Sequence, residues 1–205
     1  MRLLTLFLAT LAAVGAQKMH DHTMHHTADE FARVLDDPER DSWQKPHEVV
    51  MALGLKPGEV VADIGAGTGY FAKRFTRHGA RVLAVDISEK LLEMAKRNDP
   101  KLETILAAED DPRLPAGTVQ TIFICDTLHH IEHRPAYYAK LAAGLAPGGR
   151  IVVIDFHKKR DLPVGPPESA RLSREQVVGE LKKAGFRVSQ EWKMLPAQYF
   201  LEFRR

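Results

Sequence analysis

Three glycines directly follow an apolar segment of the sequence, where a backbone turn could hold a ligand. Residues 60–64 (VVADI) are typical of a buried strand, and Gly65, Gly67 and Gly69 come next. Glycine lets the chain turn tightly and approach a ligand closely, and the following helix offers free amide groups. No lysine follows Gly69, which excludes the common loop that binds nucleoside triphosphates. Tyr70 stands where a dinucleotide fingerprint has a small third residue, so NAD fits poorly.

Two carboxylates flank this turn and indicate the charge of the ligand. Asp63 lies two positions before the first glycine, where it would repel a pyrophosphate but attract an ammonium and a sulfonium. Asp86 ends the second apolar segment, and its carboxylate can accept hydrogen bonds from both hydroxyls of a ribose. Asp86 could instead cap the next helix, but Ser88 is the better cap. We therefore expect Asp63, Asp86 and the adjacent Ile87 to bind a cationic nucleoside.

These residues together resemble the class I S-adenosylmethionine-dependent methyltransferases, of the type that acts on small molecules. In that family an Asp-x-Gly-x-Gly-x-Gly loop, matched by residues 63–69, and an acid ending the second strand hold the cofactor. Residues 145–150 (LAPGGR) resemble the family's lead into the fifth strand. The resemblance covers roughly residues 49–205 and implies S-adenosylmethionine as the cofactor.

The resemblance also implies an acidic site near the adenine, after the third strand. The usual aspartate position holds Ala108, so the resemblance shifts adenine recognition to Glu109 or Asp110. A solvated acidic loop is the equal alternative for these two residues.

Candidate proton acceptors occur in residues 124–131 (ICDTLHHI), which resemble the family's fourth strand and the loop after it. Methyl transfer from a sulfonium depends mainly on holding the two reactants together, so a catalytic side chain is not obligatory. Where the acceptor is protonated, His129, His130 or Asp126 could take the proton. The alternative is that one histidine packs beneath the cofactor. The run lacks the Asn-Pro-Pro-Tyr type of motif, which disfavours methylation of nucleobase amino groups.

Apolar segments rich in β-branched residues alternate with amphipathic ones from residue 59 onward, a pattern typical of a parallel sheet. The sequence predicts an α/β, Rossmann-like, doubly wound sheet of seven strands, mostly parallel, with an antiparallel strand near one edge. Strands are expected at 60–64, 81–85, 102–106, 121–125, 150–154, 187–192 and 198–203, and helices at 29–35, 48–53, 70–77, 89–97, 135–145 and 173–184. Residues 36–46 are expected to form a loop, and residues 146–149 a turn.

The size and charge of the chain limit the classes of partner. At 205 residues the chain fits one domain, and its 29 basic and 27 acidic residues are scattered, with a net charge of +2. Without a basic stripe we expect no nucleic-acid partner, so a small-molecule methyl acceptor is the default. The single cysteine, Cys125, excludes an internal disulfide and a cysteine-only metal site. The sequence does not indicate the oligomeric state.

The first 28 residues differ from the rest. Residues 1–16 have a basic start, an apolar run and small residues at the end, which predicts a cleaved signal peptide and an exported or periplasmic protein. The apolar run is shorter than the roughly 20 residues of a bilayer-spanning helix, so we expect no stable membrane span. An uncleaved anchor, or a true start at Met19 with a cytoplasmic location, is the alternative. Residues 17–28 read as a His-rich linker, in which copper or zinc binding is an alternative to a solvated tail.

The sequence therefore predicts a single methyltransferase domain over residues 29–205 that uses S-adenosylmethionine to methylate an unidentified small molecule. No metal site is expected within the domain. By resemblance, the segment before the first strand forms a lid, in which Trp43, Gln44, Lys45 and Tyr70 could close over the ligands. The alternative is a catalytically silent S-adenosylmethionine-binding protein, or an exported metal-binding protein, on the same fold.

Overall fold

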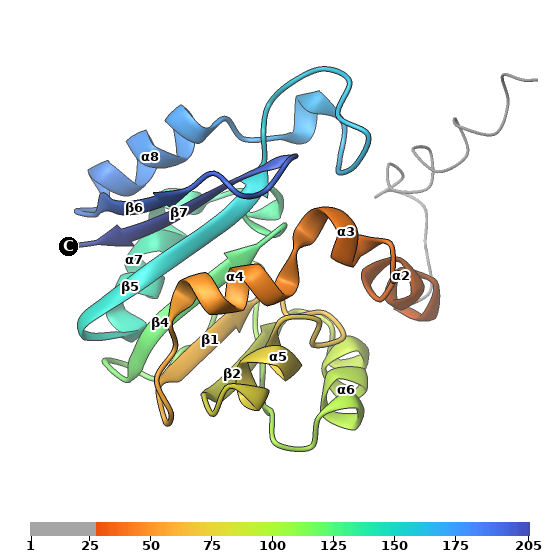
Figure 1. Cartoon of the computed structure of the whole chain (residues 1–205). Coiled ribbons are helices and arrows are strands. Elements are labelled where there is room, and N and C mark those ends of the chain that lie inside the picture. Colours follow the sequence, from red (N-terminus) through yellow and green to blue (C-terminus); the bar gives the residue numbers. More distant parts are fainter. Residues whose placement is uncertain (1–27) are drawn as a thin grey trace, which may run out of the picture.

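A seven-stranded sheet forms the centre of the molecule, in the order β3-β2-β1-β4-β5-β7-β6 (Figure 1). The computed structural model describes residues 28–205, so the predicted signal peptide and residues 17–27 of the predicted linker lie outside the described residues. Strands β1 to β5 run parallel, whereas β7 runs antiparallel to both β5 and β6. The predicted Rossmann-like α/β sheet is thereby confirmed. The strands are β1 Val60–Ile64, β2 Arg81–Asp86, β3 Glu103–Leu106, β4 Val119–Cys125, β5 Leu145–Phe156, β6 Arg187–Trp192 and β7 Gln198–Arg204.

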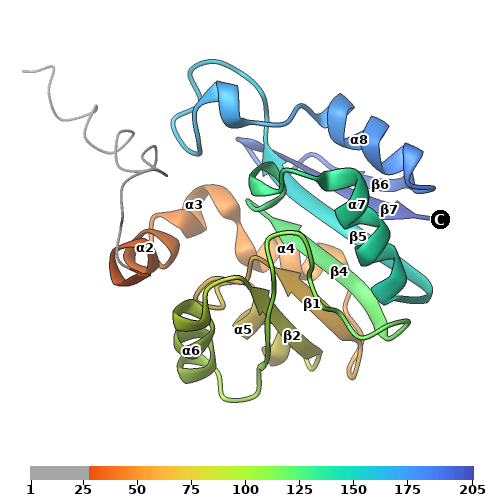
Figure 2. The ribbon, with the colours of Figure 1, turned by 180° about the vertical axis from the view of Figure 1, so that it is seen from behind.

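Helices cover both faces of this sheet (Figures 1 and 2). On one face Val49, Phe75 and Leu92 come from three helices and pack in one apolar core. On the other face Leu141 and Leu181 belong to a second core. Because both faces are covered, the central strands are apolar almost throughout. The helices are α2 Ala28–Leu35, α3 Arg40–Gln44, α4 Pro46–Leu53, α5 Ala72–Arg77, α6 Glu89–Asn98, α7 Arg134–Gly144 and α8 Arg174–Lys183, with short 3₁₀ turns η1 Leu128–His130 and η2 Glu168–Ala170. Within residues 28–205 no helix has the length and apolar character needed to cross a membrane.

The structure differs from the sequence prediction in two segments. The short helix α3 lies inside the predicted loop 36–46, and Lys45, with φ +47°, separates it from α4. The predicted turn 146–149 is part of β5, because Val119 pairs with Leu145 and the register then shifts so that Thr121 pairs with Arg150. The extra residues of β5 bulge out between these two pairs, which is why the glycine-rich sequence reads as a turn.

The order of the strands reverses between β1 and β4, which lie side by side in the middle of the sheet. From β1 the chain continues through α5 to β2, whereas from β4 it continues through η1 and α7 to β5 on the other side. The two loops therefore diverge from neighbouring strand ends and leave a crevice between them. In open α/β sheets this crevice is where ligands bind.

At the end of the sheet opposite the crevice, where β1 and β4 begin, Arg150 joins four elements. Its guanidinium donates to Thr121 Oγ1 (2.7 Å), to Glu202 Oε2 (2.9 Å) and to the carbonyl oxygen of Leu53 (2.8 Å), and it lies 3.3 Å from Glu59 Oε1. These partners lie on or next to β4, β7, α4 and β1. The guanidinium thus joins the amino ends of β1 and β4 to the carboxyl end of β7, at a distance from the crevice.

Replacing Arg150 by Met leaves the carboxylates of Glu59 and Glu202 without this buried partner, so we expect the free energy of unfolding to fall by about 3 kcal/mol. Chemical denaturation of the full chain measures this change. The matched control is Arg187→Met, since that exposed side chain lies 3.4 Å from the main-chain oxygen of Arg205, and the free energy of unfolding of this variant should change by less than about 0.5 kcal/mol. Equal losses in the two variants would contradict the assignment.

Candidate functional site

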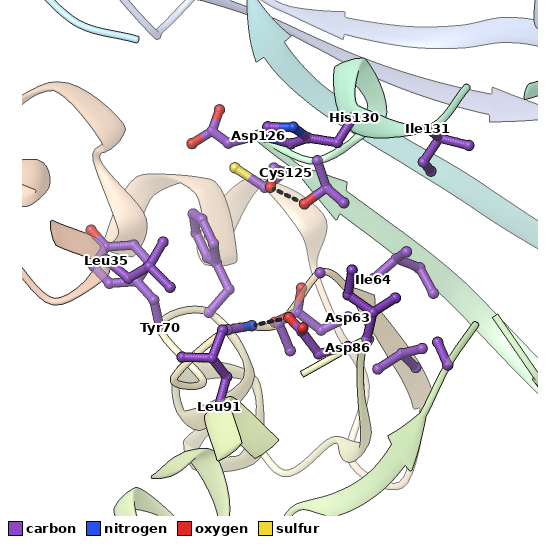
Figure 3. Close-up of a pocket in the computed structure, with 18 of the residues that line it drawn as sticks. Leu35, Asp63, Ile64, Tyr70, Asp86, Leu91, Cys125, Asp126, His130 and Ile131 are labelled. Carbon is purple, nitrogen blue, oxygen red and sulfur yellow. Dashed lines mark hydrogen bonds between the residues drawn. The ribbon is translucent and has the colours of Figure 1, made fainter. Parts of the chain in front are cut away.

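A cavity of about 480 Å³ lies at the carboxyl ends of β1, β2 and β4, in the crevice described above. This volume is in the range of small-molecule sites. Figure 3 shows side chains from separate parts of the chain that converge on it. Among the residues predicted from the sequence to form the site, those that line the cavity are Asp63, Gly65, Gly67, Asp86, Ile87, Glu109, Asp126 and His130.

The glycine turn forms one wall of the cavity, and its glycines have separate roles. Gly65 has φ +72°, and a Cβ atom at this position would lie 2.2 Å from Thr127 Oγ1, so only glycine lets the turn approach the end of β4. Gly67 donates its N–H to Asp86 Oδ2 at 2.9 Å. Gly69 does not line the cavity, because its Cα faces Ala95 of α6 instead. The third glycine therefore serves packing of the turn against a helix.

Asp86 lies at the end of β2 and joins the glycine turn to the next helix. Its second oxygen, Oδ1, accepts the N–H of Ser88 at 2.9 Å. Burial raises the pKa of Asp86, and the amides of Ser88 and Gly67 partly offset this rise. Next to it, Ile87 is 59% exposed at the mouth of the cavity, which is unusual for a large apolar side chain. The pair thus offers a fixed carboxylate beside an apolar surface.

Asp63 is the most deeply buried carboxylate that lines the cavity, with 3% of the residue exposed. Burial raises its pKa to about 7, although Arg40 and the backbone N–H of Ala72 favour the ionised form. The nearby carboxylate of Asp86 adds to the rise. Asp63 is therefore only partly ionised near neutral pH, and a cation in the cavity would favour its charged form.

Arg40 from α3 is the only basic side chain of the described residues, other than histidine, that lines the cavity. Its guanidinium lies 4.0 Å from the centre of the Tyr70 ring and donates to the carbonyl oxygen of Leu35 at 3.2 Å and to Asp126 Oδ2 at 3.3 Å. Its Nε atom is buried and has no hydrogen-bond partner among the described residues. A buried N–H without a partner costs free energy, so this atom fits an acceptor on a ligand.

Of the four residues predicted to form a lid, only Tyr70 lines the cavity. Its hydroxyl donates to Asp41, which fixes the ring beneath Arg40. Trp43 packs against Phe156 with 5.7 Å between ring centres, and Gln44 is fully buried against Gln198. Leu35 and Arg40 supply the contacts that the N-terminal segment makes with the cavity.

Asp126 and His130 lie together at one end of the cavity, as Figure 3 shows. His129 lies outside the cavity lining and is buried, with its Nδ1 at 2.9 Å from Asp155 Oδ1. Burial opposes protonation of His129, but the hydrogen bond and the charge of Asp155 prevail and raise its pKa. The three candidate proton acceptors are thus divided, two facing the cavity and one behind it.

Only one of the two acidic residues predicted to lie near the adenine, Glu109 and Asp110, lines the cavity. Glu109 lines the cavity, whereas the side chain of Asp110 is 72% exposed and pairs with Lys140 at 3.2 Å. The described residues 28–205 hold no group of three or more histidine, cysteine, aspartate or glutamate side chains that could bind a metal ion. The His-rich linker, the segment for which metal binding was the alternative, lies almost wholly outside the described residues.

Sequence reasoning missed Arg40 and Gln198, which contact Asp126 from outside the recognised motifs. Arg40 is 86 positions from Asp126 in the sequence, and Gln198 is 72 positions from it. Asp155 follows the predicted strand 150–154, which places it on the crevice side, and the structure has it at the carboxyl end of β5, where it contacts His129. Arg40 and Gln198 carry no comparable signal.

The central part of the chain matches known methyltransferases in sequence. Residues 62–153 match a family model described as a methyltransferase domain. The demethylmenaquinone methyltransferase of Tropheryma whipplei (strain Twist) is 32% identical over 110 residues, which cover 53% of this chain and 46% of that protein. Phosphoethanolamine N-methyltransferase 3 of Arabidopsis thaliana is 29% identical over 124 residues, which cover 57% and 25%. The chain thus spans about half or less of the length of these curated relatives.

The whole fold also resembles solved structures. A SAM-dependent methyltransferase from Aquifex aeolicus superimposes with a TM-score of 0.79 and 26% identity, over 87% of this chain and 98% of that one. A glycopeptide N-methyltransferase, solved in complex with sinefungin, shares the fold with a TM-score of 0.63 and 16% identity, over 78% of this chain and 85% of that one. These comparisons confirm the predicted fold and the predicted cofactor, S-adenosylmethionine.

The raised pKa of Asp63 predicts a specific dependence of stability on pH. Since its folded-state pKa of about 7 exceeds the ordinary value, its contribution to stability is complete below about pH 4 and is lost as the pH rises through 7. The free energy of unfolding of the unchanged chain should therefore fall between pH 5 and pH 8. In Asp63→Asn we expect this fall to be smaller by about 2 kcal/mol. Urea denaturation at both pH values measures it. Asp161→Asn, at an exposed residue with φ +60°, should leave the loss unchanged; an equal effect there would contradict the prediction.

Proposed function

We propose that this protein transfers a methyl group from S-adenosylmethionine to a small molecule. The observation that carries the proposal is that a single cavity brings together the glycine turn, Asp63 and Asp86. A turn of backbone amides, a carboxylate for a cation and a carboxylate for a ribose are the three groups that this cofactor requires. The relatives named for demethylmenaquinone and phosphoethanolamine support a small-molecule acceptor.

The lining of the cavity fits the parts of the cofactor. Asp86 would accept hydrogen bonds from the ribose, because a carboxylate has about four lone-pair sites and its backbone donors are the N–H groups of Gly67, Ile87 and Ser88. Ile87, Leu91 and Ile131 give apolar walls for the adenine, with Glu109 beside them. Asp63 would attract the positively charged part of the cofactor. When bound, S-adenosylmethionine supplies the methyl group on a sulfonium that is a good leaving group.

The unpartnered Nε of Arg40 would bind the carboxylate of the cofactor. This atom is buried without a partner, the residue lines the cavity, and the rest of the guanidinium is held by Leu35, Tyr70 and Asp126. An arginine fixed in this way loses little side-chain entropy when it binds a carboxylate. Arg40 would therefore recognise the amino-acid part of the cofactor, and Asp86 the nucleoside part.

Calorimetry with two ligands tests this division of roles. S-Adenosylhomocysteine contains both parts, whereas 5′-methylthioadenosine contains only the nucleoside part. We expect Asp86→Ala to weaken the binding free energy of both ligands by about 1–3 kcal/mol, since the ribose of each ligand loses its hydrogen-bond acceptor. Arg40→Met should weaken the binding of S-adenosylhomocysteine by a similar amount, about 1–3 kcal/mol, and leave the binding of 5′-methylthioadenosine unchanged.

The unchanged full chain and the thermal unfolding of both variants are the controls. Failure of the unchanged chain to bind S-adenosylhomocysteine would overturn the proposed function. A parallel loss of both ligands in Arg40→Met, without loss of folding, would overturn only the role of Arg40.

We infer that the chain is exported and that the first 16 residues are removed. Residues 1–16 carry a basic start, an apolar run and a final group of small residues, which supports processing by a signal peptidase. Mass spectrometry of the protein isolated from its natural host is expected to find Gln17 at the N-terminus. A mature chain that begins at Met1 or Met19 would contradict export. Export would also favour the alternative of a silent binding protein, since the cofactor is made in the cytoplasm.

A further inference from the structure

We propose that the methyl acceptor is a small organic amine whose nitrogen binds Asp126, and that Arg40 and Gln198 position this carboxylate. The inference rests on the proposed function and adds to it the chemical class of the acceptor. It follows from the backbone conformation of Asp126, from the side chains that hold it, and from the charges that line the cavity.

The backbone of Asp126 adopts a conformation that is uncommon for residues other than glycine. The residue follows β4 directly and has φ +55°, in the left-handed region. A residue in this region costs some free energy and persists where the surroundings enforce it, often at functional sites. Its N–H donates to the carbonyl oxygen of Ile154 at 3.0 Å, which ties it to β5. The turn directs the carboxylate into the end of the cavity beside His130 (Figure 3).

Four side chains form a closed set of hydrogen bonds around this carboxylate, which we call the polar ring: Arg40, Gln44, Asp126 and Gln198. Gln44 Nε2 donates to Gln198 Oε1 at 2.7 Å, so the amide nitrogen of Gln198 is left to donate to Asp126 Oδ1. Arg40 Nη2 lies 3.3 Å from Asp126 Oδ2 and 3.4 Å from Gln44 Oε1. Each oxygen of Asp126 thus receives one donor and retains a lone pair for a ligand.

The polar ring is buried and joins distant elements. Gln44 from α3 has no exposed surface, and Gln198 at the start of β7 is 2% exposed. Buried polar groups are expensive unless they are fully hydrogen-bonded, so these contacts strongly restrict the orientation of the carboxylate. Because both donors stabilise the ionised form, Asp126 presents a negative charge to the cavity.

The charges around the cavity favour a cationic acceptor. The lining contains one arginine, Arg40, and five carboxylates: Asp63, Asp86, Glu109, Asp126 and Glu132. The cofactor brings one net positive charge, so the loaded cavity keeps an excess of negative charge. Such a field attracts an ammonium group and repels a carboxylate or phosphate. An alcohol gains nothing from it.

Asp126 can act as the base for an amine acceptor. Burial raises its pKa to about 6, and Arg40 partly offsets the rise. The other charged groups that act on it are His129 from η1 and Asp155 from β5. An ammonium group first passes a proton to Asp126; the nitrogen lone pair then forms a bond to the methyl carbon, while the carbon–sulfur electron pair stays on sulfur as S-adenosylhomocysteine leaves. The proton on Asp126 returns to solvent. A carboxylate with a pKa of about 6 both accepts and releases this proton near neutral pH.

The first test measures Asp126 directly, without an acceptor. In the full chain, with aspartate labelled by ¹³C and loaded with S-adenosylhomocysteine, the signal of Asp126 is assigned from its loss in Asp126→Asn and followed as a function of pH. In Gln198→Leu the carboxylate loses one donor, so its titration midpoint should rise by about one pH unit. The control Gln190→Leu, on the exposed side of β6, should leave the midpoint unchanged. An unchanged midpoint in Gln198→Leu would overturn the role of Gln198.

The second test compares acceptors of equal size. Ethylamine, ethanol and acetate form one set, and benzylamine, benzyl alcohol and benzoate form another. We expect an amine to shift the Asp126 signal of the loaded protein, and to receive ¹³C-methyl from labelled S-adenosylmethionine at least tenfold faster than its matched alcohol or acid. Asp126→Asn should remove both effects, measured at concentrations of S-adenosylhomocysteine and S-adenosylmethionine that saturate the variant, because Asp126 also contacts Arg40.

The outcomes separate this inference from the proposed function. If the loaded complex forms and an alcohol or acid is methylated faster than the matched amine, the amine assignment is overturned. The same holds if no amine moves the Asp126 signal. If S-adenosylhomocysteine does not bind to the unchanged chain at all, the proposed function itself fails.

Discussion

The parallel pairing of β1 with β2 on one side and with β4 on the other is the constraint on which the site depends. Since the carboxyl ends of all three strands lie on the same side of the sheet, the residues that follow them are brought within reach of one ligand. The glycine turn follows β1, Asp86 ends β2 and Asp126 follows β4. The hydrogen bond from Gly67 to Asp86 and the close approach of Gly65 to Thr127 then fix the distances between these ends. The cavity is therefore a direct product of the sheet.

Negatively charged side chains outnumber positively charged ones in the lining of the cavity. Buried carboxylates ordinarily have a cation or several donors within reach, because the desolvated charge is otherwise unfavourable. In this cavity Arg40 acts on both Asp63 and Asp126, and the pKa values of both carboxylates remain raised. A cationic ligand would supply the missing charge. Burial of these carboxylates thus opposes folding and at the same time favours the binding of such a ligand.

Local features of the sequence predicted the fold and about a third of the residues that line the cavity. A strand followed by glycines, or ended by an acid, is encoded within ten residues, so Asp63, Gly65, Gly67 and Asp86 were found. The choice between His129 and His130 was beyond such reasoning. In a 3₁₀ turn neighbouring residues point about 120° apart, so one faces the cavity and the other faces β5, and only tertiary packing decides which. The contacts of Arg40 and Gln198 depend on the path of the whole chain.

The matched methyltransferase segment, residues 62–153, contains the glycine turn, Asp86 and Asp126, but it excludes Arg40, Gln44, Asp155 and Gln198. Three members of the polar ring thus lie outside the segment that the methyltransferase family model matches. The two terminal regions can therefore diverge while the glycine turn and Asp86 stay the same. In such a modular arrangement the identity of the acceptor in one protein is a poor guide to the acceptor in another, even where their cofactor sites agree.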